Sequence, residues 1–387
     1  MKNNKMEGIS MVDLKRQYLP LKNEIQKGFD EVLDNASFIN GPQVQQFADS
    51  LSTYLGVKHV IPCGNGTDAL QIALMALGLK PGDEVITPSF TYIATVEVVA
   101  LLGLTPVFVD VDPDYFNMDI KALKNAITNK TKAIIPVHLY GQAANMDAIL
   151  EIANEFDIPV IEDTAQALGG SYYSDDGNTY KLGTIGTIGC TSFFPSKNLG
   201  AYGDGGAIFT NDDVLAEKLK MIANHGQKVR YYHEIIGCNS RLDSLQAVVL
   251  SAKLPHLDTY CERRRQAADI YDKGLEENPF ITTPARDSKA YHVYHQYTIK
   301  LAAHISRNEV QSYLMEKGIP SMIYYPVPCH EQVMFKNYQK VVLHDLSVTN
   351  TLTPSVLSLP MHSELKIEEL EFIIKELNEI VLYLGNQ

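Results

Sequence analysis

The sequence predicts an α/β protein with a large domain built on a mostly parallel sheet and a smaller α+β domain after it. Between about residues 58 and 210, short apolar runs alternate with amphipathic segments of helical periodicity. This alternation is typical of a parallel sheet covered on both faces. With 387 residues, the chain also exceeds the size at which one core usually stops growing. We place the domains at 1–254, including an N-terminal helical segment, and at 255–387.

The elements of the large domain follow from apolar runs and from the glycines at their junctions. The predicted buried strands are residues 85–87, 107–109, 133–135 and 160–161. The predicted helices between them are residues 68–77, 92–102 and 146–156. Two further strands, 190–193 and 207–210, flank a loop and extend the same sheet.

The second part of the chain changes pattern after a long helical stretch. Residues 243–254 form a helical run that Pro255 kinks or restarts, and the helical pattern continues to about residue 277. Beyond it we predict a strand at 294–301, a helix at 307–317, a strand at 322–325 and a closing amphipathic helix at 367–384.

Composition excludes several classes of function. The formal net charge of −13 argues against a nucleic-acid surface, and an anionic substrate would need a locally basic pocket. The five cysteines are widely spread without metal-ligand spacing, which indicates reduced thiols and no metal site. The first ten residues lack the apolar core of a signal peptide, and no apolar run is long enough for a membrane span. We therefore expect a cytoplasmic protein.

One lysine organises the interpretation of the chain. Lys197 lies in the run Thr-Ser-Phe-Phe-Pro-Ser-Lys-Asn-Leu-Gly, and a Gly-Asp-Gly-Gly turn at 203–206 follows. Asp163 ends the upstream apolar run. Pyridoxal phosphate (PLP) requires a lysine that forms a Schiff base and an acidic partner for its pyridinium nitrogen. The competing interpretation is a surface lysine and a strand-end aspartate of an ordinary α/β fold.

A glycine-rich junction at 63–70 predicts a phosphate cup. Gly66 lets the backbone approach an anion, Thr67 offers a hydroxyl, and the start of a helix adds free N–H groups. The alternative is a tight turn with Thr67 as the helix N-cap. The segment is not a Walker motif, because no Gly-Lys-Ser/Thr sequence follows.

Two further segments have both functional and structural interpretations. Tyr92 follows a predicted strand end, where it could stack on a heterocycle or simply pack at a loop. Asn239 or Ser240 could cap a helix, and Arg241 could form a surface ion pair. The cations and aromatics of 228–233 suit a sugar-phosphate site or a solvated loop.

Taken in order, these motifs resemble the DegT/DnrJ/EryC1/StrS family of sugar-nucleotide aminotransferases. The resemblance rests on the cup, Glu-Asp-Thr-Ala-Gln at 162–166, Ser-Phe-x-x-Ser-Lys before Gly-Asp-Gly-Gly, and Asn-Ser-Arg-Leu-Asp-x-Leu-Gln-Ala at 239–247. It runs from about residue 11 to the C-terminus. It implies a PLP-dependent transferase of fold type I, the aspartate aminotransferase architecture, with a mostly parallel seven-stranded sheet in the large domain.

The resemblance also implies roles around the cofactor. Lys197 resembles the Schiff-base lysine that also moves the proton, and Asp163 resembles the pyridinium partner. Gln166 resembles the residue beside the phenolic oxygen of PLP, and Tyr92 occupies the position of the stacking aromatic.

The phosphate is expected to be held by residues of two subunits. Gly66, Thr67 and Ser192 match the phosphate binders, and Asn239 resembles the residue that reaches the phosphate from the neighbouring subunit. A site completed across a two-fold axis makes a homodimer the minimum assembly.

For the sugar nucleotide, the resemblance indicates contacts from Arg241, Arg230, His233, Tyr324 and Tyr325. Many relatives carry a His-Tyr-Pro motif where this chain has Tyr324-Tyr325-Pro326. The sugar substituents that are recognised are therefore expected to differ.

Within the family, the chain looks closest to the 3-aminotransferases of surface-polysaccharide and lipopolysaccharide pathways, in particular those acting on UDP-2-acetamido-2-deoxy-hex-3-uluronate with L-glutamate as amino donor. An aminotransferase for a dTDP-3-keto-6-deoxyhexose or a 4-keto nucleotide sugar is the alternative, and a regulatory protein that retains the fold is the non-enzymatic one. Lys197 argues against the related dehydratases, which carry histidine there. No cysteine has the context that desulfuration or acyl transfer would need.

Overall fold

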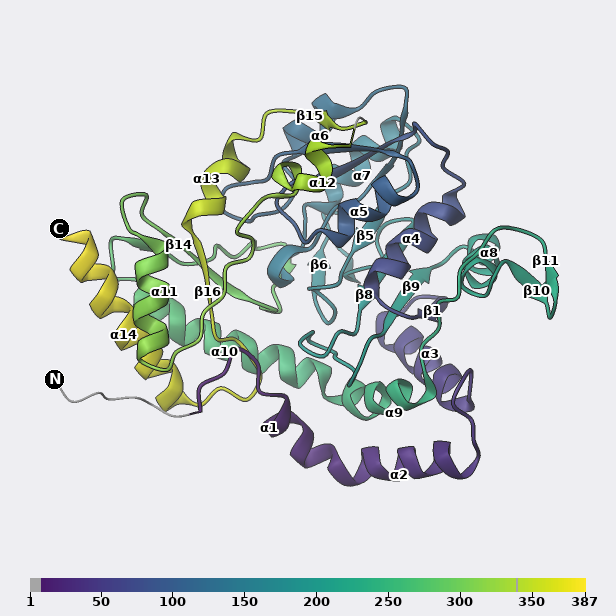
Figure 1. Cartoon of the computed structure of the whole chain (residues 1–387), viewed down its shortest axis with the longest axis horizontal. Coiled ribbons are helices and arrows are strands. Elements are labelled where there is room, and N and C mark those ends of the chain that lie inside the picture. Colours follow the sequence, from purple (N-terminus) through teal and green to yellow (C-terminus); the bar gives the residue numbers. More distant parts are fainter. Residues whose placement is uncertain (1–7, 339) are drawn as a thin grey trace.

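A central sheet organises the computed structural model, which describes residues 8–338 and 340–387 (Figure 1). Its two halves have the strand orders β1-β9-β8-β5 and β4-β2-β3-β15. Isolated parallel bridges join them, from Ile134 to Val160 and from Val137 to Asp163. β9 runs antiparallel to β1 and β8, and the other pairs are parallel. This confirms the mostly parallel seven-stranded sheet, to which β15 adds a short eighth strand at one edge.

The strands are β1 (His59–Cys63), β2 (Glu84–Pro88), β3 (Thr105–Val109), β4 (Thr131–Ile134), β5 (Ile161–Asp163), β6 (Ser171–Tyr173), β7 (Thr179–Lys181), β8 (Ile188–Ser192), β9 (Gly206–Thr210), β10 (Gln227–Val229), β11 (Tyr232–His233), β12 (Ile281–Thr282), β13 (Ala290–Tyr291), β14 (Tyr297–Leu301), β15 (Val342–Leu343) and β16 (Val356–Leu359). The α-helices are α1 (Leu14–Tyr18), α2 (Lys22–Asp34), α3 (Pro42–Leu55), α4 (Gly66–Leu77), α5 (Ala94–Leu101), α6 (Ile120–Ala126), α7 (Met146–Glu155), α8 (Asp213–Ala223), α9 (Ser244–Lys253), α10 (Leu257–Leu275), α11 (Arg307–Glu316), α12 (Val333–Lys336), α13 (Ser347–Ser355) and α14 (Ile367–Gly385).

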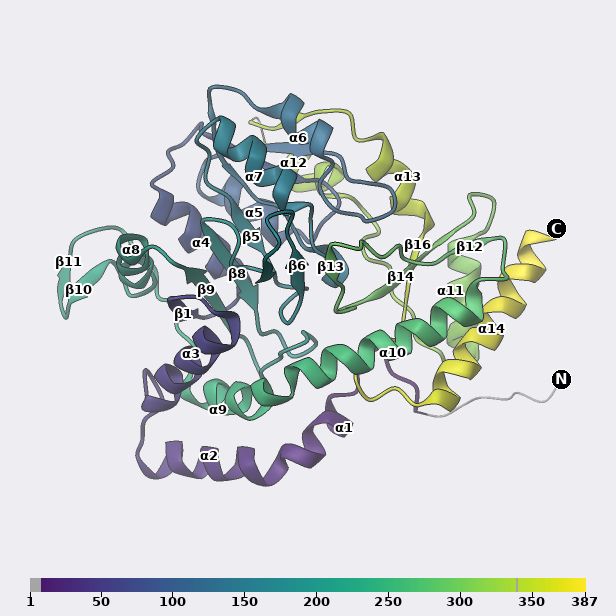
Figure 2. The ribbon, with the colours of Figure 1, turned by 180° about the vertical axis from the view of Figure 1, so that it is seen from behind.

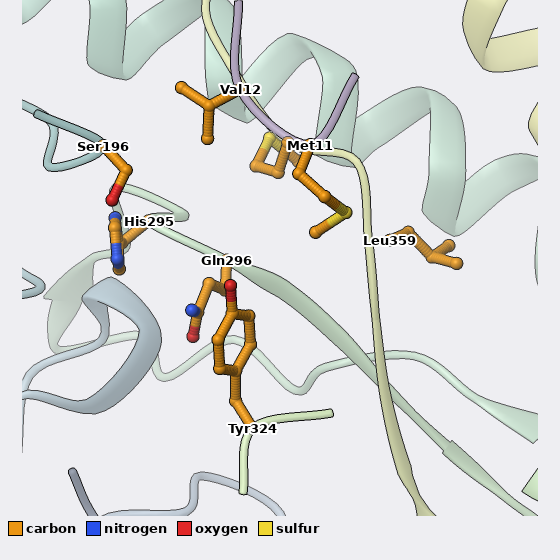
Figure 3. Close-up of a pocket in the computed structure, with 8 residues that line it drawn as sticks. Met11, Val12, Ser196, His295, Gln296, Tyr324 and Leu359 are labelled. Atoms are coloured by element: carbon orange, nitrogen blue, oxygen red, sulfur yellow. The ribbon is translucent and has the colours of Figure 1, made fainter. Parts of the chain in front are cut away.

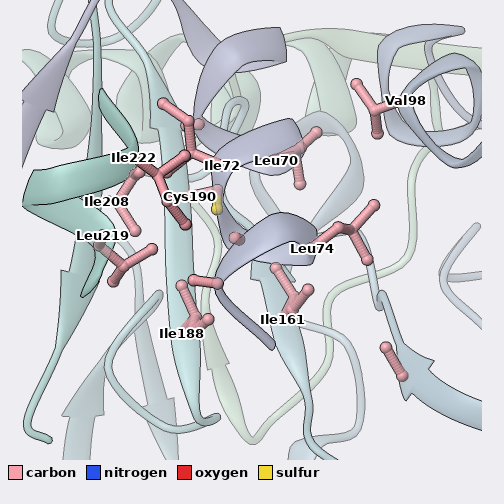
Figure 4. Packing of buried hydrophobic residues seen from close by; sticks show 14 of the residues in the cluster. Leu70, Ile72, Leu74, Val98, Ile161, Ile188, Cys190, Ile208, Leu219 and Ile222 are labelled. Atoms are coloured by element: carbon pink, nitrogen blue, oxygen red, sulfur yellow. The ribbon is translucent and has the colours of Figure 1, made fainter. Parts of the chain in front are cut away.

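The helix α4 packs against the sheet in the largest apolar cluster of the large domain. It begins where the Asn65 side chain accepts a hydrogen bond from the N–H of Asp68, and it ends at Gly78 in the left-handed conformation (φ 74°). Apolar side chains of α4, α8 and the strands interdigitate and fix the start of α4 against the sheet (Figure 4). The labelled members are Leu70, Ile72, Leu74, Val98, Ile161, Ile188, Cys190, Ile208, Leu219 and Ile222.

A second core lies toward the C-terminus. The antiparallel sheet β12-β14-β16 packs with α10, α11 and α14, whose buried faces include Tyr271, Leu314 and Ile373. The chain after residue 254 also pairs with strands of the large domain: β15 joins the central sheet beside β3, and β13 joins a small separate sheet with β6 and β7. The helix α10 contributes to this core and, through Leu257 and Cys261, to a further apolar cluster of the large domain. The domain boundary between residues 254 and 255 stays a prediction.

Most predicted elements are confirmed, with two differences of note. The helical run before Pro255 ends at Lys253, and a short 3-10 turn (Leu254–His256) leads into α10. The predicted strand 322–325 is wrong, since only Met322 forms a bridge, to Ser358. The two residues at its end bond into the large domain instead: Tyr324 accepts a hydrogen bond from the Tyr140 hydroxyl, and Tyr325 from Gln166.

The N-terminal segment contacts the C-terminal part of the chain before α1 leads on to α2 (Figures 1 and 2). The carbonyl of Met11 accepts a hydrogen bond from the N–H of Met361 (3.3 Å). In α1, Arg16 forms an ion pair with Glu369 at the start of α14 (2.8 Å). No helix in the described residues is long and apolar enough to cross a membrane.

Candidate active site

Lys197 lies on the loop between β8 and β9, beyond the carboxyl end of β8. Its backbone N–H closes a turn onto the carbonyl of Phe194 (2.9 Å). Burial lowers the pKa of the Lys197 amine to about 8, although the negative charge of Asp163 acts in the opposite direction. The amine therefore spends more time neutral near physiological pH than an exposed lysine does, as a nucleophile or proton acceptor requires.

Asp163 ends β5, directly beside β8. It stands opposite Cys190 in the parallel register, so both functional side chains leave the same edge of the sheet. The carboxylate is only 6% exposed and is fixed from two sides. The Thr95 hydroxyl donates to Oδ2 (2.8 Å), and the N–H of Ala165 donates to Oδ1 (3.1 Å). A rigid carboxylate whose charge acts on a nearby, partly buried amine suits a ligand that carries a protonated ring nitrogen.

Gln166 joins the predicted Tyr325 to Tyr140 of the large domain. Its Oε1 accepts a hydrogen bond from the N–H of Tyr140, and its Nε2 donates to the Tyr325 hydroxyl, both at 2.8 Å. Tyr92 is 56% exposed, and its ring centroid lies 6.2 Å from that of Tyr325. Gln166, Tyr92, Tyr324 and Tyr325 thus belong to one aromatic-rich wall.

The predicted cup residues come together at the start of α4. A Cβ added to Gly66 would lie 2.8 Å from the Ser192 Cβ, so only glycine allows this approach of helix and strand. Gly206, the last glycine of the 203–206 turn, is equally constrained, because its Cβ would lie 2.5 Å from the carbonyl carbon of Asn65. The tight backbone beside a helix N-terminus fits a phosphate group.

The alternative role of Thr67 as N-cap is wrong, because Asn65 is the N-cap of α4. Within the described chain, the Thr67 hydroxyl forms no hydrogen bond. The cap interpretation of Asn239 or Ser240 is also wrong, because α9 begins at Ser244 with Asp243 as its N-cap. Ser240 instead donates to Asp68 Oδ2 (2.6 Å) and accepts from the N–H of Gly64 (2.8 Å), which ties the 239–243 segment to the cup of its own chain.

Two of the remaining predicted sugar contacts lie on a projecting hairpin, away from the lysine loop of their own chain (Figure 1). Arg230 and His233 lie on the β10–β11 hairpin, which projects beyond α8 at the edge of the molecule (Figure 1). The Arg230 guanidinium covers the Tyr231 ring at 5.0 Å, and His233 Nδ1 donates to the His225 carbonyl (2.8 Å). Arg241 is partly buried and forms no ion pair in the described part of the chain, so the ion-pair interpretation is wrong.

Several site residues give no sequence signal. Thr95 is one of many threonines, yet it fixes Asp163 across 68 residues. Tyr140 resembles any packed aromatic, yet it contacts Gln166 and Tyr324. His295 and Gln296 lie inside the predicted strand 294–301 and belong to no motif, yet they line a cavity beside the lysine loop (Figure 3).

Taken together, the residues fit PLP: a partly buried amine with a lowered pKa, a fixed carboxylate one strand away, and a glycine cradle at a helix N-terminus. These groups meet at the carboxyl ends of parallel strands, where α/β proteins bind their ligands.

Comparisons with known proteins agree with this geometry. Residues 20–378 match the model of the DegT/DnrJ/EryC1/StrS aminotransferase family. The chain is 48% identical over 375 residues to the pleiotropic regulatory protein of Geobacillus stearothermophilus, covering 96% of this chain and 98% of the relative. It is 46% identical over 365 residues to UDP-2-acetamido-2-deoxy-3-oxo-D-glucuronate aminotransferase of Pseudomonas aeruginosa, covering 94% and 98%. The crystal structure of NtdA from Bacillus subtilis with bound cofactor PMP has a TM-score of 0.88 at 32% identity, covering 99% of this chain and 87% of that one.

Proposed function

Since the chain belongs to the DegT/DnrJ/EryC1/StrS aminotransferase family, we propose that it transfers an amino group from L-glutamate to the 3-keto group of a UDP-linked 2-acetamido sugar or its uronate. It is a PLP-dependent sugar aminotransferase by family membership. The substrate proposal is supported by the 46% identity to the Pseudomonas aeruginosa enzyme, whose name specifies a 3-oxo sugar on UDP. A dTDP-3-keto-6-deoxyhexose or a 4-keto nucleotide sugar is the alternative substrate.

The observation that carries the proposal is that Lys197 and Asp163 follow the carboxyl ends of neighbouring parallel strands, close enough for the Asp163 charge to act on the amine, with the glycine cradle at the start of α4. Lys197 would hold PLP, Asp163 would pair with its pyridinium nitrogen, and Gln166 and Tyr92 would contact the ring. Gly66, Thr67 and Ser192 would receive the phosphate. When bound, PLP supplies an electron sink that allows a C–H bond next to nitrogen to break.

The protein residues then have defined tasks. Lys197 Nζ is the group placed to accept the proton from the α-carbon of the donor and to deliver a proton to C3 of the sugar, since its lowered pKa leaves part of the amine neutral. Thr95 and the N–H of Ala165 keep the Asp163 carboxylate in one orientation. Both ends of the Gln166 amide are hydrogen-bonded, to the N–H of Tyr140 and to the Tyr325 hydroxyl. These bonds hold the side chain in one orientation beside the proposed ring.

We further propose a cytoplasmic homodimer that serves surface-polysaccharide synthesis. The β10–β11 hairpin and the residues after it expose Val229, Tyr231, Tyr232 and Ile236, between 59% and 86% each. Such apolar exposure on a projecting arm is typical of a surface that a partner covers. In a dimer, each subunit would bring Arg230 and His233 of its hairpin, and Asn239 after the hairpin, toward the active site of the other subunit.

A regulatory role is the second candidate, favoured by the name of the Geobacillus stearothermophilus relative. The test that separates the two is a mass-spectrometric screen of 3-keto and 4-keto nucleotide sugars with L-glutamate and PLP. We expect a mass change from ketone to amine with a 3-keto UDP sugar and formation of 2-oxoglutarate. If the protein binds PLP but forms no product from any of the ketones, the result favours the regulatory role over the aminotransferase.

A further inference from the structure

A small cavity lies beside the lysine loop, between the large domain and the C-terminal sheet. Its volume is about 40 Å³, and its polar wall consists of Ser196, His295, Gln296 and Tyr324. The Ser196 hydroxyl points toward the His295 ring, and the Tyr324 ring rises toward Gln296 (Figure 3). Met11 of the N-terminal segment closes the other side. This space admits about two or three water-sized groups and no hexose ring.

Two buried polar atoms in this wall lack a hydrogen-bond partner within the described residues. They are Nδ1 of His295 and Oε1 of Gln296, and each residue is only 8% exposed. The Gln296 amide can present either its oxygen or its nitrogen to the cavity, because a half-turn of the amide group occupies the same space. Buried polar atoms are almost always paired, so a ligand or water is expected here.

Behind this wall lies the buried guanidinium of Arg264, which has no carboxylate partner within the described residues. Arg264 of α10 is 3% exposed, and its Nη1 donates to the carbonyls of Tyr294 (3.1 Å), His295 (3.3 Å) and Met361 (3.0 Å). Within the described chain it forms no ion pair. Burial lowers the pKa of Arg264 only to about 10, so it stays charged at neutral pH. Its charge and that of Lys197 also help to hold the pKa of His295 well below the usual value, after burial itself.

We propose that this cavity binds the α-carboxylate of the amino-acid donor. The ligand must be small, anionic and rich in acceptors, because the cavity is small, its backing charge is positive, and Ser196, Tyr324, Gln296 and neutral His295 can all donate. The α-carboxylate is bonded to the carbon that loses its proton, and Ser196 is the direct neighbour of Lys197. This assignment rests on the proposed function and adds the residues that recognise the donor.

The test uses the holoenzyme with Gln296→Leu, which keeps the side-chain size and removes the amide. The matched control is Gln266→Leu, an exposed glutamine on α10. Glutarate, a dicarboxylate without an amino group, is titrated calorimetrically, and the two half-reactions are followed separately. We expect Gln296→Leu to raise the glutarate Kd and the KM for L-glutamate about tenfold or more, while the half-reaction with the keto sugar and the control variant change less than twofold.

The proposal is overturned if wild-type protein does not bind glutarate, or if Gln296→Leu, folded by circular dichroism, binds it like wild type. Equal loss in both half-reactions would also overturn it. If Gln296→Leu does not fold, Ser196→Ala takes its place with the same expected split. Failure of the proposed function is separate: wild type would then bind glutarate and react with L-glutamate but aminate no 3-keto nucleotide sugar.

Discussion

Gly66→Ala tests the phosphate cup through a single added methyl group. The new Cβ would lie 2.8 Å from the Ser192 Cβ and 3.3 Å from the Ser192 Cα. Ordinary contacts between carbon atoms are about 3.5–4.0 Å, so either α4 or β8 must shift. Ser192 cannot turn away, because its Cβ is fixed to a strand whose neighbours are β5 and β9.

Two opposing effects set the magnitude. Alanine favours a helix over glycine by up to about 1 kcal/mol, while overpacking in a closed site costs about 1–3 kcal/mol. Gly66 does not have a positive φ, so alanine can adopt its backbone conformation and stabilise the helix. We therefore expect a net loss of about 1–2 kcal/mol in the free energy of unfolding. At about 2–4 °C per kcal/mol, the midpoint of thermal unfolding should fall by about 2–8 °C. A shift of the cup by a few tenths of an ångström should also weaken PLP binding about tenfold.

Both quantities are measurable on purified protein. Thermal unfolding is followed on apoprotein, so that cofactor binding does not contribute to the midpoint, and PLP affinity is titrated by absorbance. The matched comparison is Gly66→Ala combined with Ser192→Gly, which removes the clashing Cβ. The double variant should unfold near the midpoint of Ser192→Gly alone, yet bind PLP weakly because the Ser192 hydroxyl is gone.

The reasoning is refuted if Gly66→Ala unfolds at or above the wild-type midpoint and binds PLP with wild-type affinity. An undiminished loss of stability in the double variant would place the clash elsewhere.

Four further outcomes are expected. Asp163→Asn should retain PLP but lose several orders of magnitude in turnover, because the charge opposite the pyridinium nitrogen is gone; a two- or three-fold loss would make Asp163 merely structural. Because burial lowers the pKa of Lys197 to about 8, the neutral fraction of the amine, and with it the rate of PLP uptake by apoprotein, should rise with pH through about 8 in stopped-flow absorbance; a midpoint above 10 would contradict the burial argument. Mixing Lys197→Ala with Asn239→Ala protein, each inactive or impaired alone, should restore activity on subunit exchange if Asn239 serves the partner's cofactor, and no recovery despite verified exchange would place both residues in one site. Arg241→Lys should weaken the sugar-nucleotide half-reaction far more than the glutamate half-reaction, because lysine cannot reproduce bidentate binding of an anion, whereas equal loss in both would indicate a structural role.

The sequence predicted what short-range patterns determine. Asp163 ends a strand, Gly66 begins a helix and Lys197 lies on the loop after a strand. The strand–helix alternation already places such junctions at one edge of a sheet. The mostly parallel seven-stranded sheet came from the family resemblance, whereas the strand order and the antiparallel β9 are known only from the structure.

What the sequence could not predict depends on contacts between distant segments. Thr95 reaches Asp163, and Tyr140 reaches Tyr324, only after the fold is complete. The segment 322–325 has the β-branched and aromatic composition of a strand, but its tyrosines bond to the large domain rather than to a neighbouring strand. Composition alone does not distinguish these outcomes, because strand propensity largely measures packing.

The N-terminal segment affects how the protein should be prepared. Met11 lines the cavity, its carbonyl is bonded to Met361, and Arg16 anchors the following helix to Glu369. A purification tag added before Met1 is separated from the cavity by only the ten residues that precede Met11. A tag after Gln387 leaves the chain at the outer end of α14, the opposite end of that helix from Glu369 (Figure 1). Donor kinetics should therefore be measured on protein tagged at the C-terminus.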